Sequence, residues 1–102
     1  MADLVVIYKT PTDVAAFDRY YAETHIPLAK KLPGLRKYQV SQSEVVGPGG
    51  PTGVHLIATL TFDSAAAIQD AFASPEGQAA AGDLPNFASG GADIMFFDTR
   101  EV

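Results

Sequence analysis

The sequence predicts an α+β fold in which two helices cover one face of a four-stranded antiparallel sheet. Four short segments are rich in apolar and β-branched residues, as strands are. Two intervening segments carry apolar residues at helical spacing and begin with capping residues. The resulting order is strand, helix, strand, strand, helix, strand, which is the ferredoxin-like βαββαβ pattern.

The first strand is predicted at residues 3–9, where successive apolar residues indicate burial on both faces. Thr10-Pro11-Thr12 ends this strand. We expect Thr12 to cap the following helix and Asp13 to lie in its first turn, where a negative charge suits the helix dipole. The helix is predicted to run to about Thr24.

A proline then interrupts the helical pattern. The ring of Pro27 would clash with the carbonyl of Glu23 in a regular helix, and proline has no N–H to donate. Proline suits the first turn of a new helix instead. We therefore expect a kink near His25 that leaves backbone carbonyls unpaired, followed by a short turn that reaches Lys31 or Leu32.

His25 lies at this predicted kink, four residues after Tyr21, so their side chains are neighbours. Two interpretations remain open. The imidazole either caps the unpaired carbonyls as a structural group or faces a cavity as an acid–base group. The spacing alone favours the structural interpretation.

The second strand is predicted at residues 35–44 and is polar enough to be an edge strand, with Tyr38 and Val40 on one face. Residues 47–53 are read as a long hairpin connection, because no Gly-Lys-Ser/Thr sequence follows the glycines to make a phosphate loop. The third strand, residues 54–62, has one strongly apolar face. His55 falls on its mixed face, which indicates a structural residue of the barrel interior or of an interface.

The second half of the chain supplies the remaining elements. Ser64 can cap a helix over residues 65–73, and Ser74 followed by Pro75 restarts a weak helix that ends near Gly82. Residues 83–87 are expected to be irregular or to form a further short turn. The last strand is predicted at residues 93–99, after two glycines.

The apolar pattern also predicts a partner. The first strand is apolar on both faces and the last nearly so, because residues 94–97 are consecutively apolar. The second face of the sheet therefore needs a cover, and we expect a homodimer packed sheet to sheet. The alternative, in which Glu101 and Val102 fold over this face, supplies too little material.

Composition limits the classes of function. A chain of 102 residues with 47% hydrophobic content fits one globular domain spanning residues 1–102. Its net charge of −5, without any run of Lys or Arg, disfavours nucleic acid and anionic membrane surfaces as partners. Cysteine is absent, which excludes disulfides and sulfur-ligated metals. With no secretory signal or membrane-length apolar run, we expect a cytoplasmic protein.

Several motifs resemble those of EthD-like proteins of the dimeric α+β barrel superfamily. The first half of the chain contains Tyr21-x-x-x-His25-x-Pro27-Leu28 and then Leu32-Pro33-Gly34-Leu35-x-x-Tyr38. The second half contains Phe62-x-Ser64, Ser74-Pro75-Glu76-Gly77 and Asp83-x-x-x-Phe87. Each motif is weak alone, but their order and spacing are fairly specific, and they cover nearly the whole chain.

The resemblance implies a fold, a dimer and a ligand class. EthD-like proteins are associated with the degradation of ethers and other small organic compounds, and loosely with oxidoreductase systems. Related barrels include polyketide cyclases, muconolactone isomerases and cofactor-free monooxygenases, whose ligands lie in a cleft between the helices and the sheet. By this resemblance His25 lines the cleft as an acid–base or orienting residue, and Asp83 lies near the opposite rim.

The candidate site residues follow from these arguments. The expected catalytic residues are His25, Tyr21 and Asp83, and the expected substrate-binding residues are Tyr38, Phe62 and Phe87. No metal site is expected, because two histidines thirty residues apart do not have a ligand spacing. A triad of Ser74 with His25 and Asp83 lacks the Gly-x-Ser-x-Gly motif, and nothing besides His25 suggests heme, so no cofactor is expected.

Two hypotheses of function remain. The first is a small cofactor-free enzyme acting on a hydrophobic, aromatic or polyketide-like compound, with His25 as the acid–base group of a cyclase, isomerase, decarboxylase or cofactor-free monooxygenase. The second is a non-catalytic carrier or accessory protein of an oxidoreductase system. The first hypothesis needs His25 for turnover, whereas the second needs only the apolar pocket.

Overall fold

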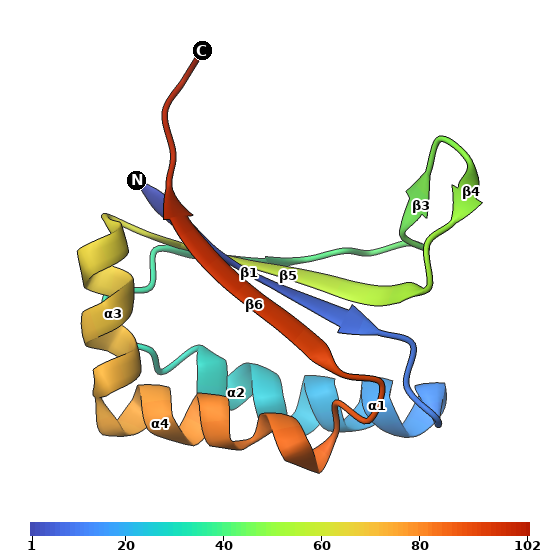
Figure 1. Ribbon diagram of the computed structural model, residues 1–102. Helices are drawn as coiled ribbons and strands as arrows, with labels where there is room; N and C mark the ends of the chain where they lie inside the picture. The colour runs from blue at the N-terminus through green and yellow to red at the C-terminus, as the bar shows by residue number, and fades with distance from the viewer.

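The computed structural model, which describes all of residues 1–102, has a four-stranded sheet with helices on one face (Figure 1). The strands have the spatial order β2-β5-β1-β6, and every neighbouring pair is antiparallel. This arrangement confirms the predicted ferredoxin-like fold. The strand bounds are β1 (Ala2–Lys9), β2 (Lys37–Val40), β5 (Val54–Phe62) and β6 (Ala92–Asp98).

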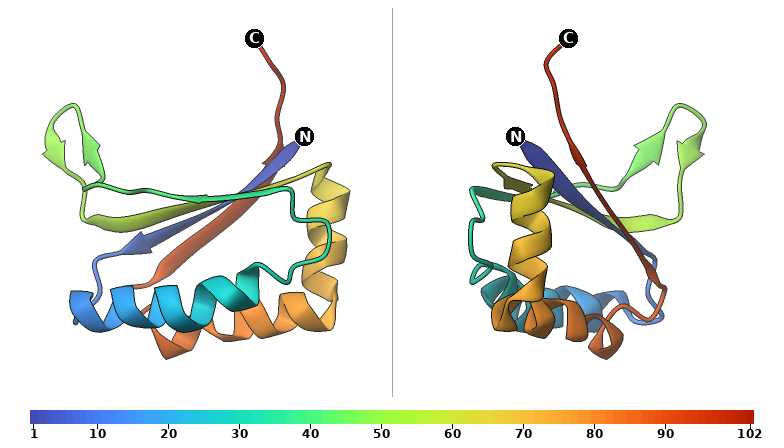
Figure 2. Two further views of the ribbon diagram at one scale, coloured as in Figure 1. Left: turned by 180° about the vertical axis from the view of Figure 1, so that it is seen from behind. Right: turned by 60° about the vertical axis from the view of Figure 1, so that its left-hand side comes forward.

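The helical layer lies beneath the sheet as two roughly parallel rods and one upright helix (Figures 1 and 2). One rod is α1 (Val14–Tyr20), the π-helical turn η1 (Tyr21–His25) and α2 (Ile26–Ala29). The other is α4 (Pro75–Gly82), which continues into the 3-10 turn η2 (Leu84–Asn86). Between β5 and α4, the helix α3 (Ala65–Ala73) stands across one end of the sheet. No helix has the length and apolarity to cross a membrane.

The predicted cap of α1 was wrong by one residue. Asp13 is the N-cap, and its Oδ1 accepts the backbone N–H of Ala16 at 3.0 Å. Thr12 is engaged elsewhere, because its backbone N–H donates to Ser89 Oγ at 3.1 Å and its hydroxyl lies 3.3 Å from the same oxygen. The predicted caps Ser64 and Ser74 are confirmed for α3 and α4.

The predicted kink is replaced by a widened turn. The backbone N–H of Ile26 donates to the carbonyl of Tyr21, five residues back, as in a π-helix. Pro27 has no N–H, and a regular helix would bring its ring against the carbonyl of Glu23. Widening the turn by one residue accommodates the proline without ending the helix, so the expected break in the helix does not occur.

The polar second strand is shorter than predicted. It covers Lys37–Val40, although Ser41 extends the ladder by donating its N–H to Ile57 O at 2.8 Å. The connection to β5 contains a small hairpin of β3 (Val46–Gly47) and β4 (Gly50–Pro51), which rises beyond the sheet (Figure 2).

A β-bulge changes the face on which His55 lies. Tyr8 of β1 pairs with Leu56, but the next residue, Lys9, pairs with Val54, so His55 is the extra residue of β5. Its Nε2 lies 2.7 Å from Asp18 Oδ1 on α1, and its ring packs edge-on against Phe17. The predicted placement of His55 on the mixed face of the sheet was therefore wrong, because strand alternation fails at the bulge.

The two faces of the sheet differ in burial. On the helix side, Leu4, Val6 and Tyr8 of β1 are buried. On the opposite side nothing in the chain covers β6, where Met95 and Phe97 each remain 45% exposed. The core therefore lies between the sheet and the helices, and the outer face presents apolar side chains without a cover.

A candidate active site around His25

The π-helical turn places His25 inside the molecule, where its side chain is buried. Its Nδ1 lies 3.0 Å from Oδ2 of Asp83, at the end of α4. The imidazole is therefore held by a carboxylate of the other helical rod, and not by the backbone carbonyls that the structural interpretation requires. This contact also brings Asp83 beside His25, whereas the resemblance placed it at the opposite rim of a cleft.

Asp83 is itself held by two further hydrogen bonds. The hydroxyl of Tyr20 donates to Oδ1 at 2.5 Å, and Nδ2 of Asn86 donates to the same oxygen at 3.0 Å. Burial alone raises the pKa of Asp83, but the hydrogen bonds from Tyr20, Asn86 and His25 outweigh it and leave the pKa below its ordinary value. The carboxylate is thus ionised at neutral pH.

An ionised Asp83 determines which nitrogen of His25 carries the proton. A carboxylate accepts hydrogen bonds, so Nδ1 of the neutral imidazole is the protonated nitrogen. The lone pair then lies on Nε2, which makes no hydrogen bond to another residue. The arrangement resembles the base and orienting carboxylate of general-base sites.

Two more hydroxyl groups meet beside the imidazole. Tyr21 OH and Tyr38 OH lie 2.5 Å apart, joining the π-helical turn to β2. Burial is the largest influence on both phenols and raises the pKa of each above its ordinary value. Both hydroxyls therefore stay protonated at neutral pH, and one of the two protons lies in the hydrogen bond between them.

These groups surround a small cavity of about 40 Å³ between the helices and the sheet. Its volume suits one or two water molecules and lies below the roughly 300–1,000 Å³ of typical ligand sites. The lining is apolar apart from the imidazole and the phenols of Tyr8, Tyr21 and Tyr38. The remaining lining residues are Leu4, Val6, Ala29, Leu32, Ala58, Leu60, Phe72, Ala80, Ala81, Leu84 and Ile94.

Next to the cavity is an open apolar groove of about 330 Å³ between β6 and the helices α3 and α4. The two hollows share four lining residues, which are Leu4, Phe72, Ala81 and Ile94. The groove therefore adjoins the cavity that His25 lines, at the edge of the sheet.

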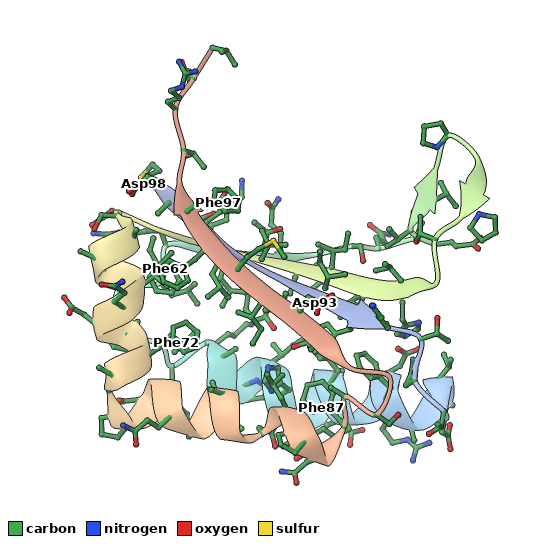
Figure 3. The ribbon with its side chains drawn as sticks, viewed as in Figure 1. Phe62, Phe72, Phe87, Asp93, Phe97 and Asp98 are labelled. Atoms are coloured by element: carbon green, nitrogen blue, oxygen red, sulfur yellow. The ribbon has the colours of Figure 1, made fainter.

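The two predicted aromatic contacts lie in different places. Phe87 packs against His25 with a ring-centroid distance of 4.7 Å, but it supports the imidazole from outside the cavity lining. Phe62 is buried between the sheet and α3, near Phe72, but it does not line the cavity (Figure 3). The fold thus gathers His25, Asp83 and the predicted tyrosines, and leaves Phe62 in the core.

Sequence reasoning missed three contributors, namely Tyr8, Tyr20 and Asn86. Tyr8 continues the buried alternation of β1 after Leu4 and Val6, so a hydroxyl at that position was the available signal for a polar group in the core. When Tyr8 is included, all four tyrosines of the chain contact or line the site. No pattern in the sequence pointed to Tyr20 or Asn86, because they come into contact with Asp83 only in the folded chain.

Other chemistry finds less support at this site. Ser74 donates to the carbonyl of Ala71 and caps α4, so it does not complete a triad with His25 and Asp83. No group of three or more His, Asp or Glu side chains is arranged to hold a metal ion. Acid–base chemistry is what the arrangement of His25 and Asp83 can perform.

Comparisons with known proteins agree with this architecture. The EthD domain family matches residues 9–91. An uncharacterised 11.0 kDa protein from the thcB–thcC intergenic region of Rhodococcus erythropolis is 39% identical over 102 residues, covering 100% of this chain and 98% of that protein.

Solved structures of similar proteins have the same fold. A protein of the ethyl tert-butyl ether d (EthD) family from Bacillus halodurans superposes with a TM-score of 0.89 at 32% identity, covering 98% of this chain and 99% of its own. SnoaB, a cofactor-independent oxygenase from Streptomyces nogalater, shares the fold with a TM-score of 0.69 at 14% identity, covering 99% and 94%. The chain belongs to the EthD family and has the ferredoxin-like fold of dimeric α+β barrel proteins.

Proposed function

We propose that this EthD family protein binds a hydrophobic, aromatic or polyketide-like small molecule between its helices and sheet, and that His25 acts on it as a general base. The observation that carries the proposal is the orientation of the imidazole. Its Nδ1 is fixed by the ionised Asp83, while the ring lines an apolar cavity with Nε2 unpaired.

The proposed chemistry requires no cofactor. Nε2 of neutral His25 accepts a proton from the ligand, and the adjacent carboxylate of Asp83 stabilises the imidazolium that forms. Such a base typically accelerates a reaction on the order of 10²- to 10⁴-fold. This suffices for a cyclisation, isomerisation or decarboxylation of an activated substrate, or for forming a carbanion that then reacts with O₂. SnoaB, which shares the fold, is a cofactor-independent oxygenase.

The size of the cavity determines how the ligand is placed. About 40 Å³ cannot contain an aromatic ring together with its substituents, whereas the adjoining groove of about 330 Å³ can hold the body of a small molecule. We propose that the ligand lies along the groove and extends only its reactive end past Phe72 and Ile94 toward His25.

The uncovered sheet face supports a homodimer. Met95 and Phe97 are exposed on β6, and Val5 and Ile7 on β1 are only partly covered, all on the face opposite the helices. A second copy packed face to face would bury this surface. Light scattering at micromolar concentration is expected to give the mass of two chains, and a single-chain mass would contradict the dimer.

A carrier or accessory role is the second candidate, and the open apolar groove is the observation that favours it. The two candidates differ in their dependence on His25. We expect His25→Gln to retain the affinity for aromatic ligands within a few-fold and to abolish turnover in a substrate screen. His55→Gln, which alters the other histidine, is the matched control and should retain both.

The same ligands can be followed by proton NMR of the two imidazoles. Addition of a bound aromatic ligand should shift the ring resonances of His25 and leave those of His55 unmoved. If no ligand of the panel moves His25, or if His25→Gln turns over substrate at the wild-type rate, the general-base proposal is wrong. Binding without any turnover in the wild type would favour the carrier.

A further inference from the structure

We propose that Tyr8, together with the Tyr21–Tyr38 pair, binds an oxygen atom of the ligand in the cavity that His25 lines. The natural substrate is then a neutral carbonyl compound with an acidic C–H bond next to the carbonyl, or its enol. This inference rests on the proposed function and specifies the substrate class of the same site.

The Tyr8 side chain combines deep burial with an unused hydroxyl. The residue is 1% exposed and lines the cavity, yet no hydrogen bond joins its hydroxyl to another residue. Its ring is fixed edge-on against Phe17 and Tyr21, at centroid distances of 5.4 and 5.6 Å. No fully buried side-chain polar atom of the chain lacks a hydrogen-bond partner, so the Tyr8 oxygen is open to a water-sized molecule, and a water or a ligand oxygen in the cavity can accept its proton.

The tyrosine pair supplies a second donor. Each hydroxyl carries one proton, and only one of the two protons can lie between Tyr21 OH and Tyr38 OH. The other proton is free to donate. The cavity therefore offers two hydroxyl donors, one from Tyr8 and one from the pair, together with a single base, Nε2 of His25.

Two donors and one base are the set of groups that enolisation requires. Nε2 of His25 removes the proton from the carbon beside the carbonyl, so the C–H bond breaks and an N–H bond forms. The electron pair of the C–H bond moves into the new C=C bond, and the C=O π pair moves onto oxygen. The tyrosine hydroxyls then donate hydrogen bonds to the resulting enolate oxygen.

The types of residue that are absent from the cavity lining limit the class of ligand further. No Ser, Thr or Cys lines it, so no nucleophile is available for acyl transfer. No Lys or Arg lines it either, so no cation pairs with a carboxylate or phosphate. Burial raises the pKa of Tyr8 as it does for Tyr21, which keeps the donors neutral at physiological pH.

The test uses 4-nitrophenol as a stand-in for the enol and 4-nitrotoluene as the control that keeps the nitro group but lacks the hydroxyl oxygen. The phenol oxygen is expected to enter the cavity while the ring stays in the groove. Wild-type protein at pH 7 should bind 4-nitrophenol more tightly than 4-nitrotoluene, and the bound phenol should show increased phenolate absorbance. Tyr8→Phe should weaken phenol binding roughly tenfold, which is typical of losing one hydrogen bond to a charged oxygen.

The control ligand without the hydroxyl group makes the result specific to the phenol oxygen. Tyr8→Phe should leave the affinity for 4-nitrotoluene unchanged and should not lower the melting temperature, because the lost hydroxyl has no partner in the protein. If Tyr8→Phe cannot be purified folded, Tyr38→Phe takes its place, with a several-fold loss of phenol affinity expected.

The outcomes separate the two proposals. Equal binding of both probes by the wild type, or an undiminished phenol preference in Tyr8→Phe, overturns the oxygen-binding assignment and leaves the hydrophobic site standing. If neither probe binds the wild type, the proposed small-molecule function fails, and the inference fails with it.

Discussion

The two histidines of this chain each pair with an aspartate, but they do so in different surroundings. The side chains of His25 and Asp83 are 8% and 6% exposed, whereas those of His55 and Asp18 are 19% and 61% exposed. Asp83 accepts two further hydrogen bonds, from Tyr20 and Asn86, and the His25 ring opens onto a cavity. Burial and a filled hydrogen-bond network thus distinguish a candidate catalytic pair from a surface contact of the same composition.

The largest expected effect comes from removing the buried carboxylate. Asp83→Ala leaves His25 Nδ1 and the Tyr20 hydroxyl without their acceptor, so we expect a loss of about 3 kcal/mol in the free energy of unfolding. Asp18→Ala, the matched change in the exposed pair, should cost less than about 1 kcal/mol. Urea unfolding of both variants measures the difference, and equal losses would contradict the comparison.

A second prediction concerns acid. The pKa of Asp83 is lowered in the folded protein, so its contribution to stability is fully present above the unfolded value of about 4 and is lost as pH falls through the folded value. Asp83→Asn should therefore flatten the decline in stability below pH 4 relative to the wild type. Unfolding curves from pH 7 to pH 2 check this prediction. Asp18→Asn is the control, and it should lose stability below pH 4 as steeply as the wild type does.

A third prediction tests the support of Asp83. Tyr20→Phe removes the hydrogen bond to Oδ1 of the ionised Asp83, so we expect the pKa of Asp83 to move upward. Because Tyr20 is partly exposed, solvent offsets part of the loss, and we expect stability to fall by less than in Asp83→Ala. Urea unfolding at pH 7 measures the loss. An unchanged stability would mean that solvent replaces the hydroxyl.

The smallest expected effect is at the exposed pair. His55→Gln retains a hydrogen-bond donor and much of the packing against Phe17, so we expect a change below about 1 kcal/mol in unfolding free energy. Thermal melting of this variant beside the wild type provides the measurement. A loss comparable to that of Asp83→Ala would falsify the distinction between the two pairs.

The sequence was informative wherever regular periodicity held. The apolar run of β1, the alternation in β5 and the caps Ser64 and Ser74 each reflect a local preference, and together they predicted the fold. The helix ends were less accurate, since Thr12 and Asp13 are both suitable caps and only the distant Ser89 decides between them.

The candidate site was predictable only in part. His25 and its neighbour Tyr21 were identified from the helical pattern before Pro27, and Asp83 through the resemblance to EthD-like proteins. The direct contact of His25 with Asp83 was not predicted, because it joins residues 58 positions apart. The face on which His55 lies was mispredicted because the bulge shifts the alternation by one residue. Periodic patterns cannot reveal such a shift, and they cannot reveal the long-range contacts of Tyr20 and Asn86.

The π-helical turn has a consequence for how this site can change during evolution. The widened turn holds one residue more than an α-helical turn, so the extra residue need not rotate the helix that follows. Deleting a single codon within η1 would restore α-helical hydrogen bonding and bring the ring of Pro27 against the carbonyl four residues before it. Among related sequences, a one-residue gap in this turn should therefore occur together with the loss of the proline.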